Sequence, residues 1–193
     1  MTKAAKPKSL KATVTHLEMK RRPRTTTPLP VNMHATLMRA TEIPLHFYRY
    51  LHWQVGREWH WVTRLRMNDE ELSKTVHAKT NRIFVLSVDG APAGFFELTE
   101  VDDSTVELSY FGLMEHVRKR GLGEWMLGQA IATAWSNTPT RVIVSTNTLD
   151  HSAALPLYQK MGFEPVSQNQ AIIRPLADNE ILALMKAESQ NAG

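Results

Sequence analysis

The sequence predicts a mixed α/β (α+β) fold, and three observations indicate it. Short segments rich in β-branched or alternating apolar residues are interleaved with longer segments whose apolar residues recur at helical spacing. Asp89-Gly90 separates two strand-like segments, as expected for a tight hairpin turn. In the second half of the chain, the glycine-containing hexapeptide 118–123 joins a strand to a helix. Strands and helices are therefore mixed along one chain.

The composition is that of a globular protein. The chain has 193 residues, of which 42% are hydrophobic and 22% charged, enough for one domain with terminal extensions. It has no cysteine, which excludes a disulfide framework, a cysteine-ligated zinc site and a thiol nucleophile. No run approaches the ~18–20 apolar residues of a membrane span, and no apolar signal segment follows the first lysines. We therefore expect a soluble, cytoplasmic protein with no membrane partner.

The basic charge is concentrated at the N-terminus. Residues 1–30 contain eight basic residues and one acidic residue, a balance of +7, whereas the remaining 15 basic and 18 acidic residues give −3. We interpret residues 1–30 as a basic Pro/Thr-rich leader in which Leu10–Met19 forms an extra edge strand. A basic arm can bind nucleic acid, but a solvated leader without that function is the favoured interpretation.

Two helices are expected in the first half, after a strand from Met33 to Arg39. The first has Thr41 as its N-cap and Pro44 in its first turn, where the missing N–H costs little. The second begins at Asn68 or Asp69, with acidic residues near its positive end. Apolar residues at helical spacing mark the first helix: Ile43, Phe47, Tyr50, Leu51 and Val55.

The rest of the chain continues the alternation of strands and helices. Gly162 is placed to end a helix, as glycine commonly does. We assign residues 31–177 to one domain and residues 178–193 to a short C-terminal helix and tail. Strands are predicted at 82–88, 93–99, 104–113, 141–145 and 171–173, and helices at 121–136, 151–161 and 178–186.

The segment Arg118-Lys119-Arg120-Gly121-Leu122-Gly123 predicts a phosphate-binding loop. Its glycines allow the backbone to approach a ligand without Cβ interference. The first N–H groups of the following helix lack intrahelical partners and carry the positive end of the helix dipole, which favours phosphate. Three basic side chains add charge, so we expect a phosphorylated cofactor.

Other glycine motifs fit this loop less well. A dinucleotide fingerprint requires a third glycine where Met126 stands. A Walker loop requires Lys-Ser/Thr after its last glycine, and Glu124 stands there instead. The pattern Gln/Arg-x-x-Gly-x-Gly/Ala fits without a mismatch at Arg118, Gly121 and Gly123.

A second motif follows downstream, at Ala154, Leu157, Tyr158, Lys160, Gly162 and Phe163. With both motifs in this order, the chain resembles the GNAT superfamily of N-acetyltransferases over roughly residues 80–175. The resemblance implies a mixed, mostly antiparallel twisted sheet flanked by helices, and acetyl-CoA as co-substrate. It does not cover the leader or the last dozen residues. Dimers are common in this superfamily, so a homodimer is compatible with the resemblance.

The resemblance also implies roles for individual residues. Backbone groups of Phe111, Gly112 and Leu113 would pair with pantetheine and polarise the thioester carbonyl. His151 stands where the family often has an asparagine that contacts the cofactor. The pyrophosphate would be held by the phosphate loop and the start of its helix: Arg118, Lys119, Arg120, Gly121, Leu122, Gly123 and Glu124.

Two catalytic residues are implied. Glu107 coincides with the general-base glutamate of one branch of the family, whereas Thr146 stands where another branch has its glutamate. Tyr158 matches the tyrosine that protonates the departing thiolate. A carboxylate can take the proton that an amine must lose before attack. Alternatively, Glu107 is an exposed strand residue and Tyr158 a packing residue.

The implied function is transfer of an acetyl group from acetyl-CoA to a primary amine of a small molecule or peptide. Two alternatives are a non-catalytic acyl-CoA-binding module and a protein acetyltransferase acting near nucleic acid. Six aromatic residues between 47 and 61 either wall the acceptor site or belong to the core. The histidines show no metal-ligand spacing, so we expect no metal site.

Overall fold

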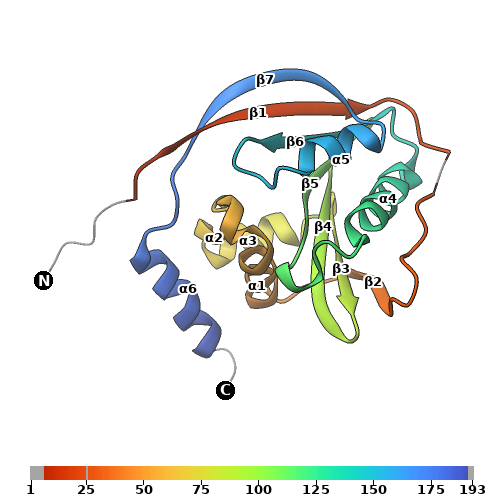
Figure 1. The fold of residues 1–193 in the computed structure, drawn as a ribbon. Helices are drawn as coiled ribbons and strands as arrows, with labels where there is room; N and C mark the ends of the chain where they lie inside the picture. The colour runs from red at the N-terminus through yellow and green to blue at the C-terminus, as the bar shows by residue number, and fades with distance from the viewer. Residues whose placement is uncertain (1–6, 25, 191–193) are drawn as a thin grey trace, which may run out of the picture.

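A seven-stranded sheet forms the centre of the protein, whose computed structural model describes residues 7–24 and 26–190. The strands are β1 (Leu10–Met19), β2 (Ala35–Ala40), β3 (Asn81–Val88), β4 (Ala91–Asp102), β5 (Thr105–Leu113), β6 (Arg141–Asn147) and β7 (Glu164–Ile173). Their order is β2-β3-β4-β5-β6-β1-β7 (Figure 1). Neighbouring strands are antiparallel except β5 and β6, which are parallel. The predicted mixed, mostly antiparallel sheet is confirmed.

Helices cover both faces of this sheet. They are α1 (Leu45–Gly56), α2 (Thr63–Arg66), α3 (Asp69–Val76), α4 (Leu122–Ala134), α5 (Ala154–Lys160) and α6 (Asp178–Gln190). Figure 1 shows α1, α2 and α3 on one side of β3–β5 and α4 on the other. Within residues 7–24 and 26–190, no helix has both the length and the apolar character needed to cross a membrane.

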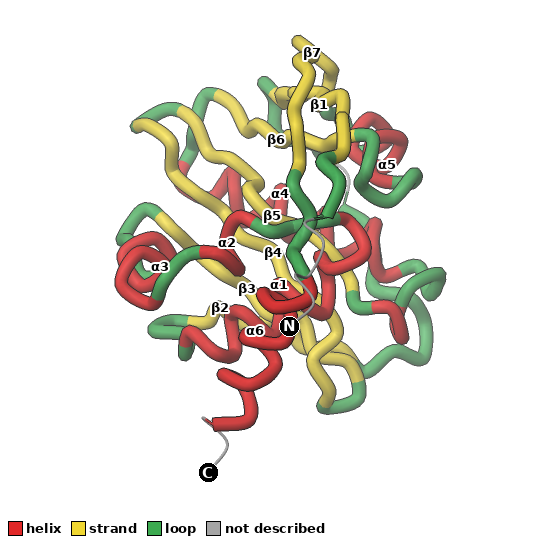
Figure 2. The backbone as a smooth tube through the Cα atoms, turned by 90° about the vertical axis from the view of Figure 1, so that its left-hand side faces the viewer, coloured by secondary structure: helices red, strands yellow, loops and turns green. Residues whose placement is uncertain are grey.

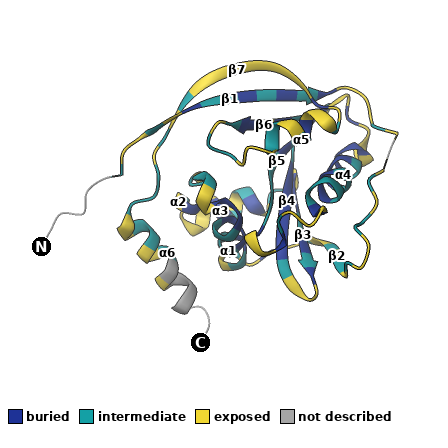
Figure 3. Ribbon diagram, viewed as in Figure 1, coloured by how far each residue is buried: buried dark blue, intermediate teal, exposed yellow. Residues whose placement is uncertain are grey.

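Adjacent residues of β4 supply the two hydrophobic cores. Phe95 and Phe96 are both fully buried, and side chains alternate between the faces of a strand. Phe95 packs with α1 and α3 residues such as Leu51 and Leu72, whereas Phe96 packs with α4 residues such as Met126. Strand β4 is therefore buried on both faces, and Figure 3 shows it mainly in dark blue.

Local signals set most of the element ends. The hairpin between β3 and β4 turns at Asp89 and Gly90, which both have positive φ, as the dipeptide predicts. Asn68 caps α3 in a capping box with Glu71, which confirms the expected start of that helix. The prediction of Thr41 as N-cap of α1 is wrong: the helix starts at Leu45, after Pro44.

Strand β1 was predicted correctly in extent but wrongly at an edge. It lies inside the sheet, antiparallel to β6 on one side and to β7 on the other. Leu17 and Met19 are buried in the core that includes α4. Residues 10–19 therefore belong to the sheet rather than to a separate solvated leader. The edge position was predicted wrongly because the number of neighbours of a strand depends on long-range pairing.

Strand β7 is longer than the predicted segment 171–173. It spans Glu164–Ile173 and pairs along most of β1, although Ser167–Gln170 is a polar stretch without strand-like alternation. Pairing with β1 explains the extension, since tertiary contacts override weak local preference. Figure 2 shows β1 and β7 side by side at the top of the molecule, and Figure 3 shows β7 largely exposed.

The chain between β1 and β2 runs past α4 (Figure 1). Leu29 and Met33 pack against the core, and a Cβ at Gly128 would lie 3.7 Å from Thr27. A Cβ at Gly121, just before α4, would lie 3.3 Å from Pro30. The end of the predicted leader therefore packs beside the start of α4.

Candidate active site

The site begins where β5 and β6 separate. These parallel strands pair only over Thr105–Leu108 and Arg141–Val144. Beyond those residues, both strands line a cavity of about 940 Å³, which also receives side chains from the turn after α1, the start of α4, the β6–α5 connection and the end of β7. An unpaired strand edge on each side of the split leaves backbone hydrogen-bonding groups facing this space.

The predicted phosphate loop opens into this cavity. Lys119 has φ 61° and Gly121 has φ 79°, so two residues of the loop are left-handed. Left-handed residues of this kind occur in backbone turns that bind anions. The helix α4 begins at Leu122, and its first N–H groups have no intrahelical partner. The geometry suits a pyrophosphate at the positive end of α4.

Most of the predicted cofactor residues line the cavity, but two do not. Leu122 is fully buried in the core, so only its backbone is available to a ligand. The side chain of Arg120 is exposed and lies outside the cavity lining. The predicted residues in the lining are Phe111, Gly112, Leu113, Arg118, Lys119, Gly121, Gly123, Glu124 and His151.

The Arg118 side chain is already engaged by protein groups. Its guanidinium donates to the carboxylate of Glu58 and, at 3.3 Å, to the backbone oxygen of Leu113. It also lies 5.4 Å from the centre of the Trp59 ring. Arg118 therefore ties the phosphate loop to the turn after α1.

Gly112 explains how closely that turn approaches β5. A Cβ at this position would lie 2.3 Å from Val55 of α1 and 3.3 Å from the Trp61 ring. Any side chain would therefore displace α1 or Trp61 from the strand. Gly112 thus allows Trp61 to pack directly against the unpaired part of β5. Trp59 and Trp61 together form the aromatic wall of the cavity.

Tyr158 lies in the cavity wall, on the α5 side. It is only 6% exposed and packs against Phe111 and Phe163, with ring centres 6.3 and 5.9 Å away. Burial, and secondarily the charge of Asp150, raises the pKa of the phenol. The phenol is therefore protonated at neutral pH, and its raised pKa makes it a weaker acid than an exposed tyrosine.

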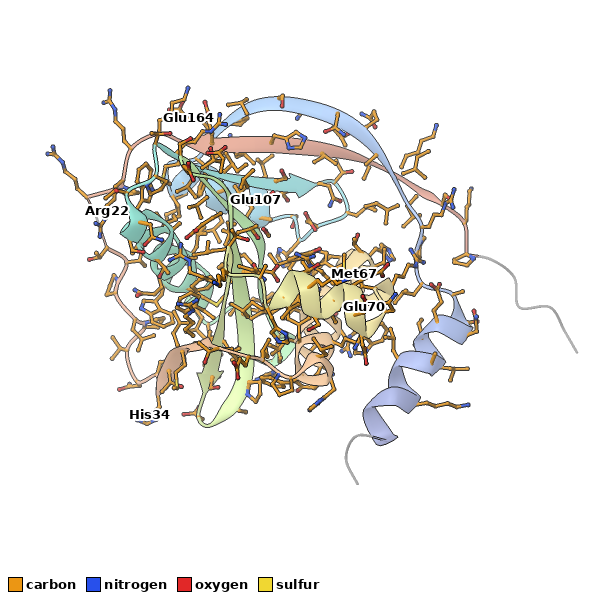
Figure 4. All side chains as sticks on the ribbon, turned by 180° about the vertical axis from the view of Figure 1, so that it is seen from behind. Arg22, His34, Met67, Glu70, Glu107 and Glu164 are labelled. Carbon is orange, nitrogen blue, oxygen red and sulfur yellow. The ribbon has the colours of Figure 1, made fainter. Side chains whose placement is uncertain are left out.

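Glu107 does not line the cavity. It lies on β5 opposite Ile143 of β6, within the paired part of the two strands, and is labelled in Figure 4. Its carboxylate accepts a hydrogen bond of 3.3 Å from the hydroxyl of Ser109, which does line the cavity. Glu107 is therefore connected to the cavity through its hydrogen bond with Ser109.

Asp150 is a cavity residue that the sequence analysis missed. One carboxylate oxygen accepts from the Thr146 hydroxyl at 2.9 Å and from the Asn147 backbone and side-chain amides at 2.8 and 3.2 Å. The other accepts from the indole N–H of Trp61 at 3.2 Å. The signal available in the sequence was the position of Asp150 next to His151, a predicted cofactor residue.

A buried polar cluster lies next to the aromatic wall, where the ring of His52 is 6.0 Å from the ring of Trp61. Glu97 of β4 is fully buried, accepts from the Tyr48 hydroxyl and forms an ion pair of 2.8 Å with Arg64 of α2. His52 is also fully buried and has no hydrogen-bond partner. Such a carboxylate requires its partners, so the cluster holds α2 against the sheet.

The aromatic residues between 47 and 61 divide between the cavity and the core. Trp59 and Trp61 line the cavity, whereas Tyr48 is fully buried and Phe47 and Tyr50 pack against the core. Among the residues described, no group of three or more acidic or histidine side chains could hold a metal ion.

The chain belongs to the GNAT acetyltransferase family. The model of that family matches residues 41–163, which include the phosphate loop, the β5–β6 split and the whole of α5 with Tyr158. Acetyl-CoA is the co-substrate of acetyltransferases in this family. The search of curated proteins finds no significant match to this sequence.

Solved structures share the fold at low sequence identity. A GCN5-related N-acetyltransferase from Sphaerobacter thermophilus has a TM-score of 0.58 at 14% identity, over 92% of this chain and 55% of that one. One from Kribbella flavida has 0.55 at 15%, over 90% and 59%. A GNAT family acetyltransferase from Elizabethkingia anophelis with acetyl-CoA bound has 0.52 at 19%, over 69% and 78%. This chain spans 52–64% of the length of the first five structures it matches.

Proposed function

We propose that this member of the GNAT family transfers an acetyl group from acetyl-CoA to a primary amine of a small molecule or peptide by direct attack on the thioester. One observation carries the proposal: the phosphate loop, the unpaired ends of β5 and β6, and Tyr158 border a single cavity that continues to the aromatic wall. A cofactor on the loop would therefore share one cavity with an acceptor.

The proposed cofactor site uses the backbone more than side chains. The N–H groups from Lys119 to Glu124 would hold the pyrophosphate at the positive end of α4. Backbone groups from Phe111 to Leu113 would pair with pantetheine, because β6 no longer pairs with β5 there. A backbone donor near the thioester oxygen would stabilise the developing oxyanion.

Tyr158 and Glu107 are the proposed proton-transfer residues. Tyr158 would donate to the departing thiolate, and its phenol is protonated at neutral pH before that step. Glu107 would act as the base through the Ser109 hydroxyl, since its carboxylate lies behind that residue. The amine forms the C–N bond, the C–S bond breaks, and the products are an amide, free coenzyme A and a proton released to water.

An acetyl-CoA-dependent thiol-release assay tests this function. Amines, polyamines, amino acids, aminoglycosides and peptide N-termini would each be supplied with acetyl-CoA, and free coenzyme A would be measured. The proposal predicts amine-dependent thiol release together with an acetylated product by mass spectrometry. Tight acetyl-CoA binding without transfer to any amine would favour a non-catalytic acyl-CoA-binding module instead.

A further inference from the structure

Asp150 holds an uncompensated negative charge in the cavity. Two acidic side chains occur among the described residues that line it, Glu124 and Asp150. Glu124 forms an ion pair with Lys160 at 2.6 Å. Just outside, Glu58 is paired with Arg118 and Glu97 with Arg64. No described basic side chain forms an ion pair with Asp150, whose partners are all neutral donors.

The hydrogen bonds of Asp150 fix its orientation and leave capacity on one oxygen. The oxygen that accepts from Thr146 and Asn147 already has three donors, whereas the other oxygen has the Trp61 indole N–H alone. A carboxylate oxygen accepts about two hydrogen bonds, so the second oxygen can take another donor. A cationic donor would also neutralise the charge, and charge-assisted hydrogen bonds are the stronger kind.

Several aromatic residues share the cavity with this carboxylate. The indole N–H of Trp61 donates a hydrogen bond to it, and the Trp61 ring lies 5.2 Å from the ring of Tyr110. The ring of His151, the next residue in the chain, lies 5.3 Å from the ring of Trp59. All these residues line the same cavity. Aromatic surface beside a carboxylate suits a ligand with an apolar aromatic body and a cationic end.

Asp150 and the proposed proton donor Tyr158 line the same cavity. After burial, the charge of Asp150 is the second cause of the raised pKa of the Tyr158 phenol. A cation bound at Asp150 would therefore share the cavity with the residue proposed to face the departing thiolate. Correct placement of the amine is itself a large contribution to the rate.

We propose that Asp150 binds the ammonium group of an arylalkylamine acceptor, with the aryl group against Trp59, Trp61 and Tyr110. This proposal rests on the proposed amine acetylation, and it names the acceptor class and the residue that selects it. The second oxygen of Asp150 accepts one ammonium N–H. A neutral alcohol of the same shape makes the aromatic contacts but does not compensate the charge.

Phenethylamine and its neutral analogue 2-phenylethanol test this assignment by calorimetry. The full chain would be saturated with coenzyme A, which carries no acetyl group, and titrated with each probe at pH 7.5. We expect the wild type to bind phenethylamine at least tenfold more tightly than 2-phenylethanol. In Asp150→Asn, phenethylamine affinity should fall at least tenfold and that of 2-phenylethanol should hardly change, so that the preference disappears.

Thr146→Val separates charge recognition from the bracing of the loop. It removes one donor to Asp150 and keeps the carboxylate, so the amine-over-alcohol preference should survive even if both affinities fall. Loss of the preference in Thr146→Val, an unchanged preference in Asp150→Asn, or no preference in the wild type would overturn the proposal. Coenzyme A binding is measured first on each sample: its absence rejects the proposed function, whereas normal binding without preference rejects only the role of Asp150.

Discussion

The proposed cofactor side and the proposed acceptor side of the cavity are built in different ways. Apart from His151, the proposed cofactor side comes from one continuous segment, from the end of β5 through the phosphate loop into α4. The proposed acceptor side combines the turn after α1, Asp150 of the β6–α5 connection and the end of β7, which come from separate parts of the sequence. The first side depends on local backbone geometry, and the second on the packing that brings distant segments together. Mutations should therefore separate them.

Strand β1 supports both sides of the cavity, so truncation of one of its buried side chains should affect the two sides together. Leu17 is 1% exposed and packs beneath α4 and α5. Leu17→Ala should lower the free energy of unfolding by about 2–5 kcal/mol, the usual cost of truncating a buried leucine. Denaturant unfolding measures this. Lys11→Ala, an exposed position on the same strand, should change stability by less than about 0.5 kcal/mol. Equal effects would mean that β1 is not part of the core.

Glu107 should matter for turnover and not for the cofactor. Glu107→Gln should lower kcat/KM by ~10²-fold, as expected for removal of a general base, and leave acetyl-CoA affinity unchanged. Part of the activity should return as pH rises, because more of the amine is then neutral. Ser109→Ala should produce a similar loss, since the hydroxyl connects Glu107 to the cavity. Full activity of Glu107→Gln between pH 6 and 9 would exclude Glu107 as the base.

Tyr158 should have a smaller effect, at the boundary of the two sides. Tyr158→Phe should slow turnover ~10-fold by removing the proton donor to the thiolate, while the packing against Phe163 is kept. The loss should shrink with a thioester whose thiol leaves more easily. If the loss were the same with both thioesters, Tyr158 would have only a packing role.

Behind the acceptor wall, His52 should make stability depend on acid. Burial, and then the charge of Arg64, lowers the pKa of His52 well below its usual value. The folded protein therefore keeps His52 neutral, whereas the unfolded chain binds a proton below about pH 6.5. Stability is thus lost as pH falls, by about 1 kcal/mol between pH 6.5 and 5.5. His52→Phe should remove this loss in denaturant unfolding, and His46→Gln, an exposed position on α1, should not.

Local sequence was sufficient for a hairpin turn, a helix cap and the glycine loop of the proposed cofactor side. The hairpin at Asp89-Gly90, the cap at Asn68 and the glycine loop each depend on neighbouring residues, so their geometry follows from local rules. The interior place of β1 depends on pairing with β6 and β7, more than a hundred residues away. Asp150 became visible only with its contacts to Trp61 and Thr146, because a single aspartate in a loop carries no motif.

Calorimetric titration of acetyl-CoA into Gly121→Asp tests the central claim, that the cofactor is held by the phosphate loop. Gly121 has φ 79°, and an aspartate there would bring strain and negative charge to the proposed pyrophosphate site. Gly90→Asp is the matched control, since Gly90 has φ 83° and nothing within 4 Å of the added Cβ. The account predicts at least 100-fold weaker binding in Gly121→Asp, with wild-type affinity in Gly90→Asp. Wild-type affinity in a folded Gly121→Asp variant would contradict it.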